Sequence, residues 1–227
     1  MPKDTFFNLP DNKRDRILTI ALEEFADKPY EQGSVTAIAQ RAQIAKGSIY
    51  QYFEDKKDLY LYLLKVGSDA KLEYLIARQP TDWSDFFKAY YQAMLVGAEY
   101  DLRNYQFVSL VDKVLQSPFR EECLAMLKKM SGEYLQILIS AAQAAGQVRH
   151  DMPVQYIVYF LNTLSTEFGR LVAAELGLDV TMLYHEEHRE KLAAIDINPM
   201  LSYLMELIRH GIAQPHEPAP QLDGGRA

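Results

Sequence analysis

The chain has little cysteine, no long apolar run and no apolar leader, and each absence excludes a class of protein. Its 227 residues include one cysteine, Cys123, so no disulfide can form within the chain and a reducing compartment is favoured. No apolar run reaches the roughly 18 residues that a membrane-spanning helix needs, so no membrane partner is expected. The N-terminus lacks the apolar segment of a secretory signal, and we expect a cytoplasmic protein.

The sequence also lacks a catalytic or cofactor-binding pattern. No Ser-His-Asp arrangement, phosphate loop or pair of carboxylates stands out, so we expect neither an enzyme nor a bound cofactor. His185 and His188 are three residues apart, whereas the histidines of the H-E-x-x-H zinc motif are four apart, so a solvated surface is favoured over a metal site. Cys123 lies on an apolar stripe near a single basic residue, Arg120, which favours a buried inert thiol over a redox sensor.

The composition that remains is ordinary for a globular protein, with 48% hydrophobic and 24% charged residues. A net charge of −7 argues against a nucleic-acid binder, but the charge is unevenly distributed. Residues 1–60 carry 9 basic and 10 acidic side chains, and residues 61–227 carry 15 and 21. Between Thr36 and Phe53 the charged residues are Arg41 and Lys46, both basic, so a local patch can still meet phosphate.

Apolar residues recur at helical spacing nearly throughout, and no strand pattern competes with them. Ser34, Asp55 and Asp82 are candidate N-caps, and Gly146 is a candidate stop. Two of the expected helices begin near residues 82 and 117, and the others span about 13–26, 36–42, 46–52, 55–78, 104–115, 152–176 and 198–212. Residues 214–227 are rich in proline and glycine and are expected to form a disordered tail.

Two short expected helices, 36–42 and 46–52, are joined by three or four residues. The residues placed to pack between them are Ile38, Ala42, Ile44 and Ile49. That arrangement is typical of a helix-turn-helix, whose second helix enters the major groove of DNA. A compact helical corner without such a role is the alternative that the residues leave open.

The second short helix presents groups that form hydrogen bonds instead of an apolar face. Gly47 allows the helix N-terminus to approach DNA closely, where free amides suit phosphate. Lys46 is placed for a guanine edge or a phosphate, and Gln51 for an adenine edge. Other polar residues are suited to phosphate oxygens, which fix position but not sequence. The candidate DNA-binding residues are Thr36, Arg41, Lys46, Gly47, Ser48, Tyr50, Gln51, Tyr52 and Lys56.

Residues 11–60 resemble the DNA-binding domain of the tetracycline-repressor (TetR/AcrR) family. The matching motifs are Ile17-Leu18-x-x-Ala21-x-x-x-Phe25, Ile38-Ala39-x-x-Ala42, Lys46-Gly47-Ser48-Ile49-Tyr50-x-Tyr52-Phe53 and Lys56-Lys57-x-Leu59. Gln43 stands where the family usually has glycine, in a left-handed position that costs a non-glycine residue about 1 kcal/mol. The resemblance implies an all-α protein of nine or ten helices, a homodimer, a C-terminal domain that responds to a small molecule, and usually repression of transcription.

We therefore expect an N-terminal three-helix DNA-binding domain, residues 1–54, and a C-terminal helical bundle for effector binding and dimerisation, residues 55–213. In the resembling family the last two helices form a four-helix bundle across a two-fold axis. Two reading helices then lie about 34–36 Å or more apart, which requires a palindromic DNA operator. The candidate core or interface residues, which the sequence does not divide between the two roles, are Leu164, Phe168, Leu171, Leu201, Leu204 and Ile208.

Aromatic residues are frequent in the C-terminal part, and at helical spacing they belong more often to a core than to a ligand site. A mostly apolar pocket between bundle helices is nevertheless where an effector would bind, with tyrosines as polar handles. Helix 55–78 is the expected lever between this pocket and the DNA-binding part. We expect a hydrophobic or amphipathic effector, ringed by some of Phe86, Tyr90, Met94, Phe107, Tyr134 and Tyr159.

Two other functions stay open at this stage. The chain can be a helical binding or scaffold protein whose helix-turn-helix is only structural. It can also be an activator that uses the same DNA reader, because repression and activation differ by where the operator lies.

Overall fold

The computed structural model describes residues 1–178, 185 and 188–213, and it builds them from eleven α-helices. In this part of the chain no strand forms, and the β-type contact is an isolated bridge between Val148 and Ala213. The helices that the sequence did not predict are α1 (Asp4–Phe7) and α10 (Arg189–Ala194). They have four and six residues, too few for a periodic pattern to reveal.

The other nine helices follow the expected order. They are α2 (Asp11–Asp27), α3 (Val35–Arg41), α4 (Lys46–Tyr52), α5 (Lys56–Ala77), α6 (Phe86–Arg103), α7 (Tyr105–Leu115), α8 (Arg120–Ala144), α9 (Val154–Glu175) and α11 (Asn198–Ile212). The all-α prediction is confirmed. The expected disordered tail, residues 214–227, lies outside the described residues.

Polar side chains cap several helices as expected. The Ser34 hydroxyl accepts from the Ala37 amide at 3.2 Å, and the Asp55 carboxylate accepts from the Asp58 amide at 2.8 Å. The expected cap of α6 was wrong, because Asp85 and not Asp82 accepts from the first amides of that helix. Asp82 instead closes a turn by accepting from the Ser84 amide at 2.8 Å. The helix therefore begins later than predicted.

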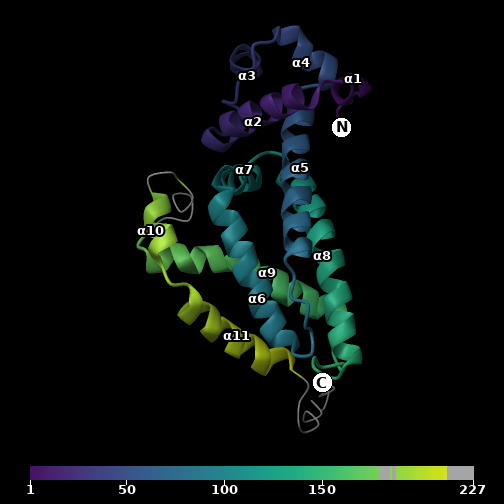
Figure 1. Cartoon of the computed structure of the whole chain (residues 1–227), viewed down its shortest axis with the longest axis vertical. Coiled ribbons are helices and arrows are strands. Elements are labelled where there is room, and N and C mark those ends of the chain that lie inside the picture. The colour runs from purple at the N-terminus through teal and green to yellow at the C-terminus, as the bar shows by residue number, and fades with distance from the viewer. Residues whose placement is uncertain (179–184, 186–187, 214–227) are drawn as a thin grey trace, which may run out of the picture.

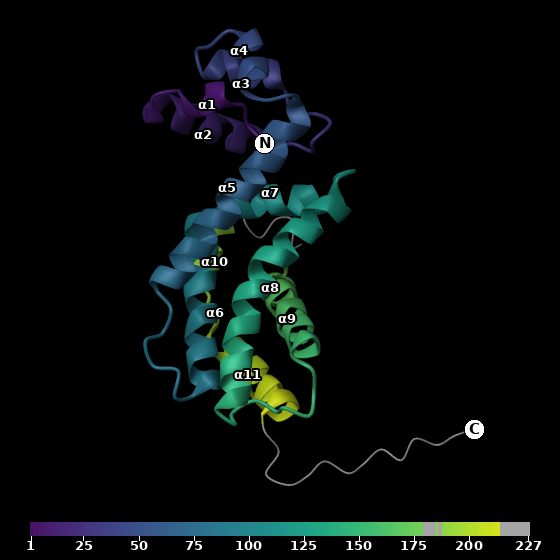
Figure 2. The same cartoon turned by 90° about the vertical axis from the view of Figure 1, so that its right-hand side faces the viewer.

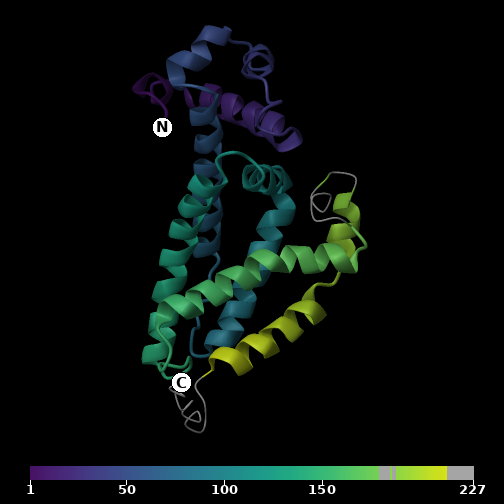
Figure 3. The same cartoon turned by 180° about the vertical axis from the view of Figure 1, so that it is seen from behind.

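The helices α1 to α4 gather at one end of the molecule, and α5 leads from them into the body (Figures 1 and 2). Beside α5 lie α6 and α8, whereas α9 and α11 cover one side of the body, which faces the viewer in Figure 3. Among the described helices, none is long and apolar enough to cross a membrane. The predicted DNA-reading helices thus occupy a tip, away from the C-terminal helices.

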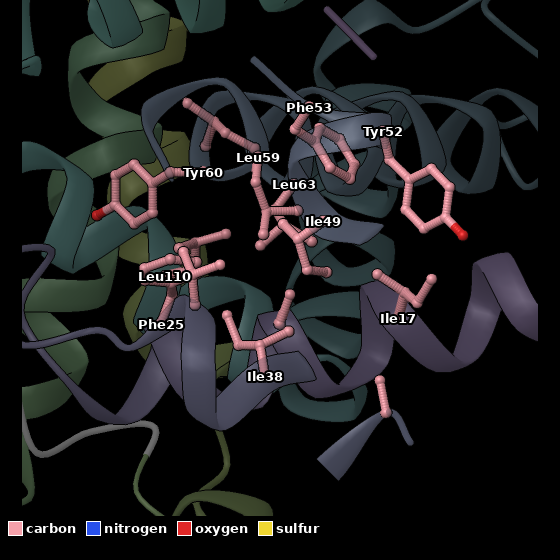
Figure 4. Packing of buried hydrophobic residues seen from close by; sticks show 14 of the residues in the cluster. Ile17, Phe25, Ile38, Ile49, Tyr52, Phe53, Leu59, Tyr60, Leu63 and Leu110 are labelled. Carbon is pink, nitrogen blue, oxygen red and sulfur yellow. The ribbon is translucent and has the colours of Figure 1, made fainter. Parts of the chain in front are cut away.

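Two large clusters of buried residues make up most of the core, and a small third cluster forms around Val172 and Ala173 of α9. The first joins α1 to α5 with α7 and the beginning of α8, and Figure 4 shows part of it around Phe25, Ile49 and Leu110. The second joins α6, α8, α9 and α11. Packing therefore continues past residue 54, the predicted domain boundary, because α2 lies against α7 and α5 belongs to the first cluster. A movement of α5 or α7 would therefore also displace the N-terminal helices that pack against them.

Candidate nucleic-acid interface and effector region

The segment from α3 to α4 has the geometry of a helix-turn-helix. Ile38, Ala42 and Ile49 are fully buried between the two helices and their supports. Gln43, in the turn, has a φ of 56°, which is the left-handed conformation expected where related sequences carry glycine. The Ile44 amide then donates to the Ala39 carbonyl at 3.0 Å and closes the turn. The core of the motif leaves the opposite faces of both helices open.

Most of the predicted DNA-binding side chains lie on those open faces. Thr36, Lys46, Gly47 and Gln51 are exposed, and the Tyr50 side chain is 42% exposed. Lys46 forms no ion pair with the described residues, so its charge is available to a partner. Two other candidates are less free. Ser48 is half-buried, and Arg41 forms an ion pair with Glu23 of α2.

The structure directs the remaining two candidates inward. Tyr52 is 7% exposed, and its ring packs 6.0 Å from the ring of Phe6. The Lys56 ammonium donates to the Tyr30 carbonyl at 2.8 Å and lies 4.3 Å from the centre of the Tyr30 ring. It also bonds the carbonyls of Glu31 and Gly33, at 3.3 and 3.2 Å. Both groups thus take part in the protein's own packing, and a phosphate would compete with these contacts for them.

The N-terminal segment is a part of this region that was not predicted from the sequence. Residues 3–7, which include α1, lie against the last turn of α4. The signal that points to it is the pair Phe6 and Phe7, apolar side chains just before a helix whose own stripe begins later. Phe6 is fully buried. The segment also contacts the α4 backbone.

The six predicted effector-binding residues do not come together. Phe86, Tyr90 and Met94 belong to the second cluster, whereas Phe107 belongs to the first. The hydroxyl of Tyr90 lies 2.9 Å from that of Ser165, and burial raises the pKa of Tyr90 to about 12. The other two tyrosines stand apart. The Tyr134 hydroxyl donates to the Gln79 side chain at 2.7 Å, and Tyr159 is 68% exposed.

Helix α5 carries polar groups that are buried without a partner. The hydroxyls of Tyr60, Ser68 and Tyr74 have no hydrogen-bond partner among the described residues. Burial raises the pKa of Tyr60, and the Tyr74 ring lies 5.1 Å from that of Tyr100 on α6. An unsatisfied buried hydroxyl costs about 1–3 kcal/mol, so such groups call for a ligand or water to bond. These three hydroxyls mark a region that the sequence did not single out.

The six predicted core or interface residues lie on α9 and α11, and their side chains differ in burial. Leu201 and Ile208 are fully buried in the second cluster, and Leu171 is 44% exposed. The other three are partly buried against the same cluster: Leu164, Phe168 and Leu204. Other large apolar side chains of these two helices are exposed although they were not interface candidates, and they are Tyr156, Tyr159, Phe160, Tyr203 and Leu207.

The sulfur and histidine candidates are Cys123, His185 and His188. Cys123 is fully buried, and burial raises the pKa of its thiol to about 11. Among the described residues, no group of three or more His, Cys, Asp and Glu side chains is placed to hold a metal ion. Glu186 and Glu187, which lie between His185 and His188 in the sequence, are outside the described residues.

Comparisons with known proteins agree with this geometry. Residues 17–63 match the family model described as bacterial regulatory proteins, tetR family. The HTH-type transcriptional activator FasR of Mycolicibacterium smegmatis is 30% identical over 108 residues, which cover 47% of this chain and 49% of that protein. The chain thus spans about half or less of the length of the first curated relatives it matches.

Solved structures match over more of the chain. A TetR family transcriptional regulator from Chloroflexus aurantiacus is 29% identical with a TM-score of 0.68, over 95% of this chain and all of that one. The regulator FadR from Bacillus subtilis, solved in complex with stearoyl-CoA, has a TM-score of 0.66 at 17% identity, over 87% and 98% of the two chains. The helix-turn-helix, the family model and the structural match agree: residues 17–63 are similar to the tetR family of bacterial regulatory proteins, and the fold over 95% of the chain is similar to that of a TetR family regulator.

Proposed function

We propose that the protein is a transcriptional regulator that binds a palindromic DNA operator as a homodimer in the cytoplasm and responds to an amphipathic small molecule. One observation supports the DNA-binding part of this proposal. The second helix of the helix-turn-helix, α4, keeps Lys46, Tyr50 and Gln51 on its open face at one tip of the molecule. A scaffold protein would have no need for an unpaired lysine and hydrogen-bonding side chains on that face.

The roles of these side chains follow from their chemistry. Lys46 and Gln51 suit base edges in the major groove, and Tyr50 and Thr36 suit phosphate oxygens. Arg41 reaches DNA if it exchanges Glu23 for a phosphate, since both groups are partly exposed. The overall charge of −7 does not oppose this, because Lys46 stands at the tip without an acidic partner among the described residues.

Selection of bound duplexes from a random DNA pool tests the DNA-binding proposal. We expect an inverted repeat. On the selected operator, Lys46→Ala weakens binding by about tenfold and lowers the slope of log affinity against log salt by about 0.9 if Lys46 contacts phosphate. Tyr50→Phe, which removes one hydroxyl, weakens binding by about fivefold.

The control is Lys88→Met, which removes an exposed lysine of α6 far from the tip. It should bind the operator like the wild type. Failure of every duplex to bind above the background of bulk DNA would refute the proposal and favour a scaffold whose helix-turn-helix is structural.

The dimer is proposed from the apolar side chains that α9 and α11 expose. Tyr203 and Leu207 lie one turn apart on α11 and are 75% and 69% exposed. On α9, Tyr156, Tyr159 and Phe160 follow the same helical spacing. Figure 3 shows both helices on the same side of the molecule. Exposed apolar side chains on two helices at the same side of a molecule favour a protein interface.

The effector is proposed to lie along α5, where the hydroxyls of Tyr60, Ser68 and Tyr74 are buried without a hydrogen-bond partner among the described residues, and where the apolar first cluster includes Tyr60 and packs against Tyr74. Such a lining suits a ligand with an apolar chain and at least one hydrogen-bonding group. Because FadR is solved with stearoyl-CoA, a long acyl thioester is the first probe. Stearoyl-CoA, stearate and free coenzyme A separate the contributions of chain and headgroup.

Calorimetry with these three probes, followed by release of the selected operator, tests the effector proposal. Binding of stearoyl-CoA or stearate, with loss of operator affinity, supports an acyl ligand. If no probe binds and none changes operator affinity, an acyl effector is refuted and the DNA-binding proposal stands by itself.

Repression is proposed as the direction of control, because a dimer seated across an operator excludes other proteins from that DNA. Activation is the second candidate, since FasR is named an activator. A reporter gene behind the selected operator decides between them. Repression predicts higher expression when the regulator is deleted, and activation predicts lower expression.

A further inference from the structure

The last turn of α4 is held by the N-terminal segment of the chain. A helix leaves its final four carbonyls without partners inside the helix. In α4 the first of these, the Ile49 carbonyl, accepts from the Phe53 amide at 2.8 Å. The other three, those of residues 50–52, accept from residues 3 and 5, which lie more than forty positions earlier in the sequence.

Each of the three bonds is specific. The Lys3 ammonium donates to the Tyr50 carbonyl at 2.9 Å, and the Lys3 amide donates to the Tyr52 carbonyl at 2.8 Å. The Thr5 hydroxyl donates to the Gln51 carbonyl at 2.5 Å. A positive charge at a helix C-terminus also interacts favourably with the helix dipole. All four carbonyls at the end of α4 therefore accept a hydrogen bond.

The same segment ties α4 to the beginning of α5. The Phe6 ring is fully buried, 4.9 Å from the ring of Phe53, which follows α4. It also lies edge-on to the ring of Tyr62 on α5, at 5.8 Å. The short helix α1 is thus wedged between the DNA-reading helix and the long helix that runs into the effector region.

We propose that residues 3–7 form a clamp that sets the position of α4 for DNA binding, with Lys3 and Thr5 as its positioning residues. The inference rests on the proposed function, because positioning matters only if α4 reads DNA. The physical reason is that a seven-residue helix is not stable by itself and needs contacts from outside. Because Phe6 also contacts Tyr62, a shift of α5 is transmitted through the clamp to α4.

Hydrogen exchange of the free protein tests the clamp without DNA. Thr5→Val keeps the shape of the side chain and removes its donor, so amides in α4 should exchange about fivefold faster. Thr5→Ser keeps the hydroxyl and should restore the wild-type rate. Since Thr5 is exposed, neither variant should disturb the fold. An unchanged exchange rate of α4 in Thr5→Val overturns the clamp.

Operator affinity tests whether the clamp serves DNA binding. Thr5→Val and Lys3→Met should each weaken binding by about fivefold, and Thr5→Ser and Lys3→Arg should restore it. The slope of log affinity against log salt should not change in Lys3→Met, because the ammonium bonds a carbonyl and not a phosphate. Lys88→Met removes the same charge at the far end and should leave both affinity and slope unchanged.

Two outcomes of the affinity measurements also overturn the proposal. One is wild-type affinity in Thr5→Val, and the other is a slope lowered by about 0.9 in Lys3→Met, which would make Lys3 a direct phosphate contact. Failure of the clamp can be distinguished from failure of the proposed function. If the wild type binds no operator, the proposed function fails. If only the clamp is wrong, the wild type binds DNA and the variants bind equally well.

Discussion

At the scale of single residues, the carboxylate of Glu24 on α2 is a charge buried beside the helix-turn-helix. It is 4% exposed, and one of its oxygens accepts from the Lys28 ammonium at 2.9 Å and the Ser34 amide at 3.0 Å. Burial by itself would raise its pKa, but these two hydrogen bonds and the charges of Lys28 and Arg41 lower the pKa below its usual value. Because Ser34 caps α3, Glu24 fixes the beginning of the helix-turn-helix.

We predict that Glu24→Gln lowers the free energy of unfolding by about 1–3 kcal/mol at neutral pH. The pKa of the folded state lies below that of the unfolded state, so the carboxylate stabilises the fold above about pH 4.5, and this contribution is lost as the pH falls through the folded-state value. Urea unfolding of both proteins between pH 7 and pH 3.5 measures the difference, which should shrink toward the acid end.

A matched control is Glu23→Gln, which removes a carboxylate paired with Arg41 in a more exposed place. It should change stability by less than about 1 kcal/mol. A Glu24→Gln difference that stays constant across the pH range would contradict the assigned role of its charge.

At the scale of elements, the crossing of α5 and α7 depends on Gly67. A methyl group on this residue would lie 2.2 Å from the Phe107 ring of α7, and that ring is itself buried in the first cluster. We predict that Gly67→Ala lowers the free energy of unfolding by about 1–3 kcal/mol through overpacking, even though alanine favours helix.

The control for this prediction is Gly97→Ala on α6. A methyl group there would lie 3.9 Å from Leu75, an ordinary contact, so alanine should stabilise the protein by up to about 1 kcal/mol. Thermal and urea unfolding of both variants measure the effects. Equal stability of Gly67→Ala and the wild type would mean that α7 moves away without loss.

The reading helices were predicted well because local signals specify them. Helix α4 has the predicted bounds, α3 is displaced by one residue, and the left-handed Gln43 stands where the family resemblance placed it. The beginning of α6 was harder to predict. Its Phe86 amide donates to the side chain of Gln147 at 2.5 Å, and no local pattern reveals a partner 61 positions away. A tertiary hydrogen bond therefore helps fix which aspartate begins the helix.

At the scale of the whole molecule, the proposed dimer brings two copies of the reading tip to one operator. We predict that Leu207→Glu, which places a charge in the exposed apolar surface of α11, converts the dimer to a monomer. Operator affinity should then fall by more than about tenfold, because the two half-sites are no longer bound together. Light scattering after size-exclusion chromatography measures the oligomeric state.

The control is Ile76→Glu, a similar change at an exposed apolar residue of α5, outside the proposed surface. This variant should remain dimeric and bind the operator normally. A dimeric Leu207→Glu would place the interface elsewhere, and a monomeric wild type would contradict the homodimer.

The sequence by itself determined the helical class and the helix-turn-helix, because the spacing of Ile38, Ala42 and Ile49 is a local property of two short helices. Only the tertiary structure decided which side chains of α9 and α11 are buried. Both helices are apolar on broad faces, and burial depends on which helix packs across each face. Tertiary contacts also turned Lys56 inward, toward carbonyls of a loop more than twenty positions away, and left Lys46 free.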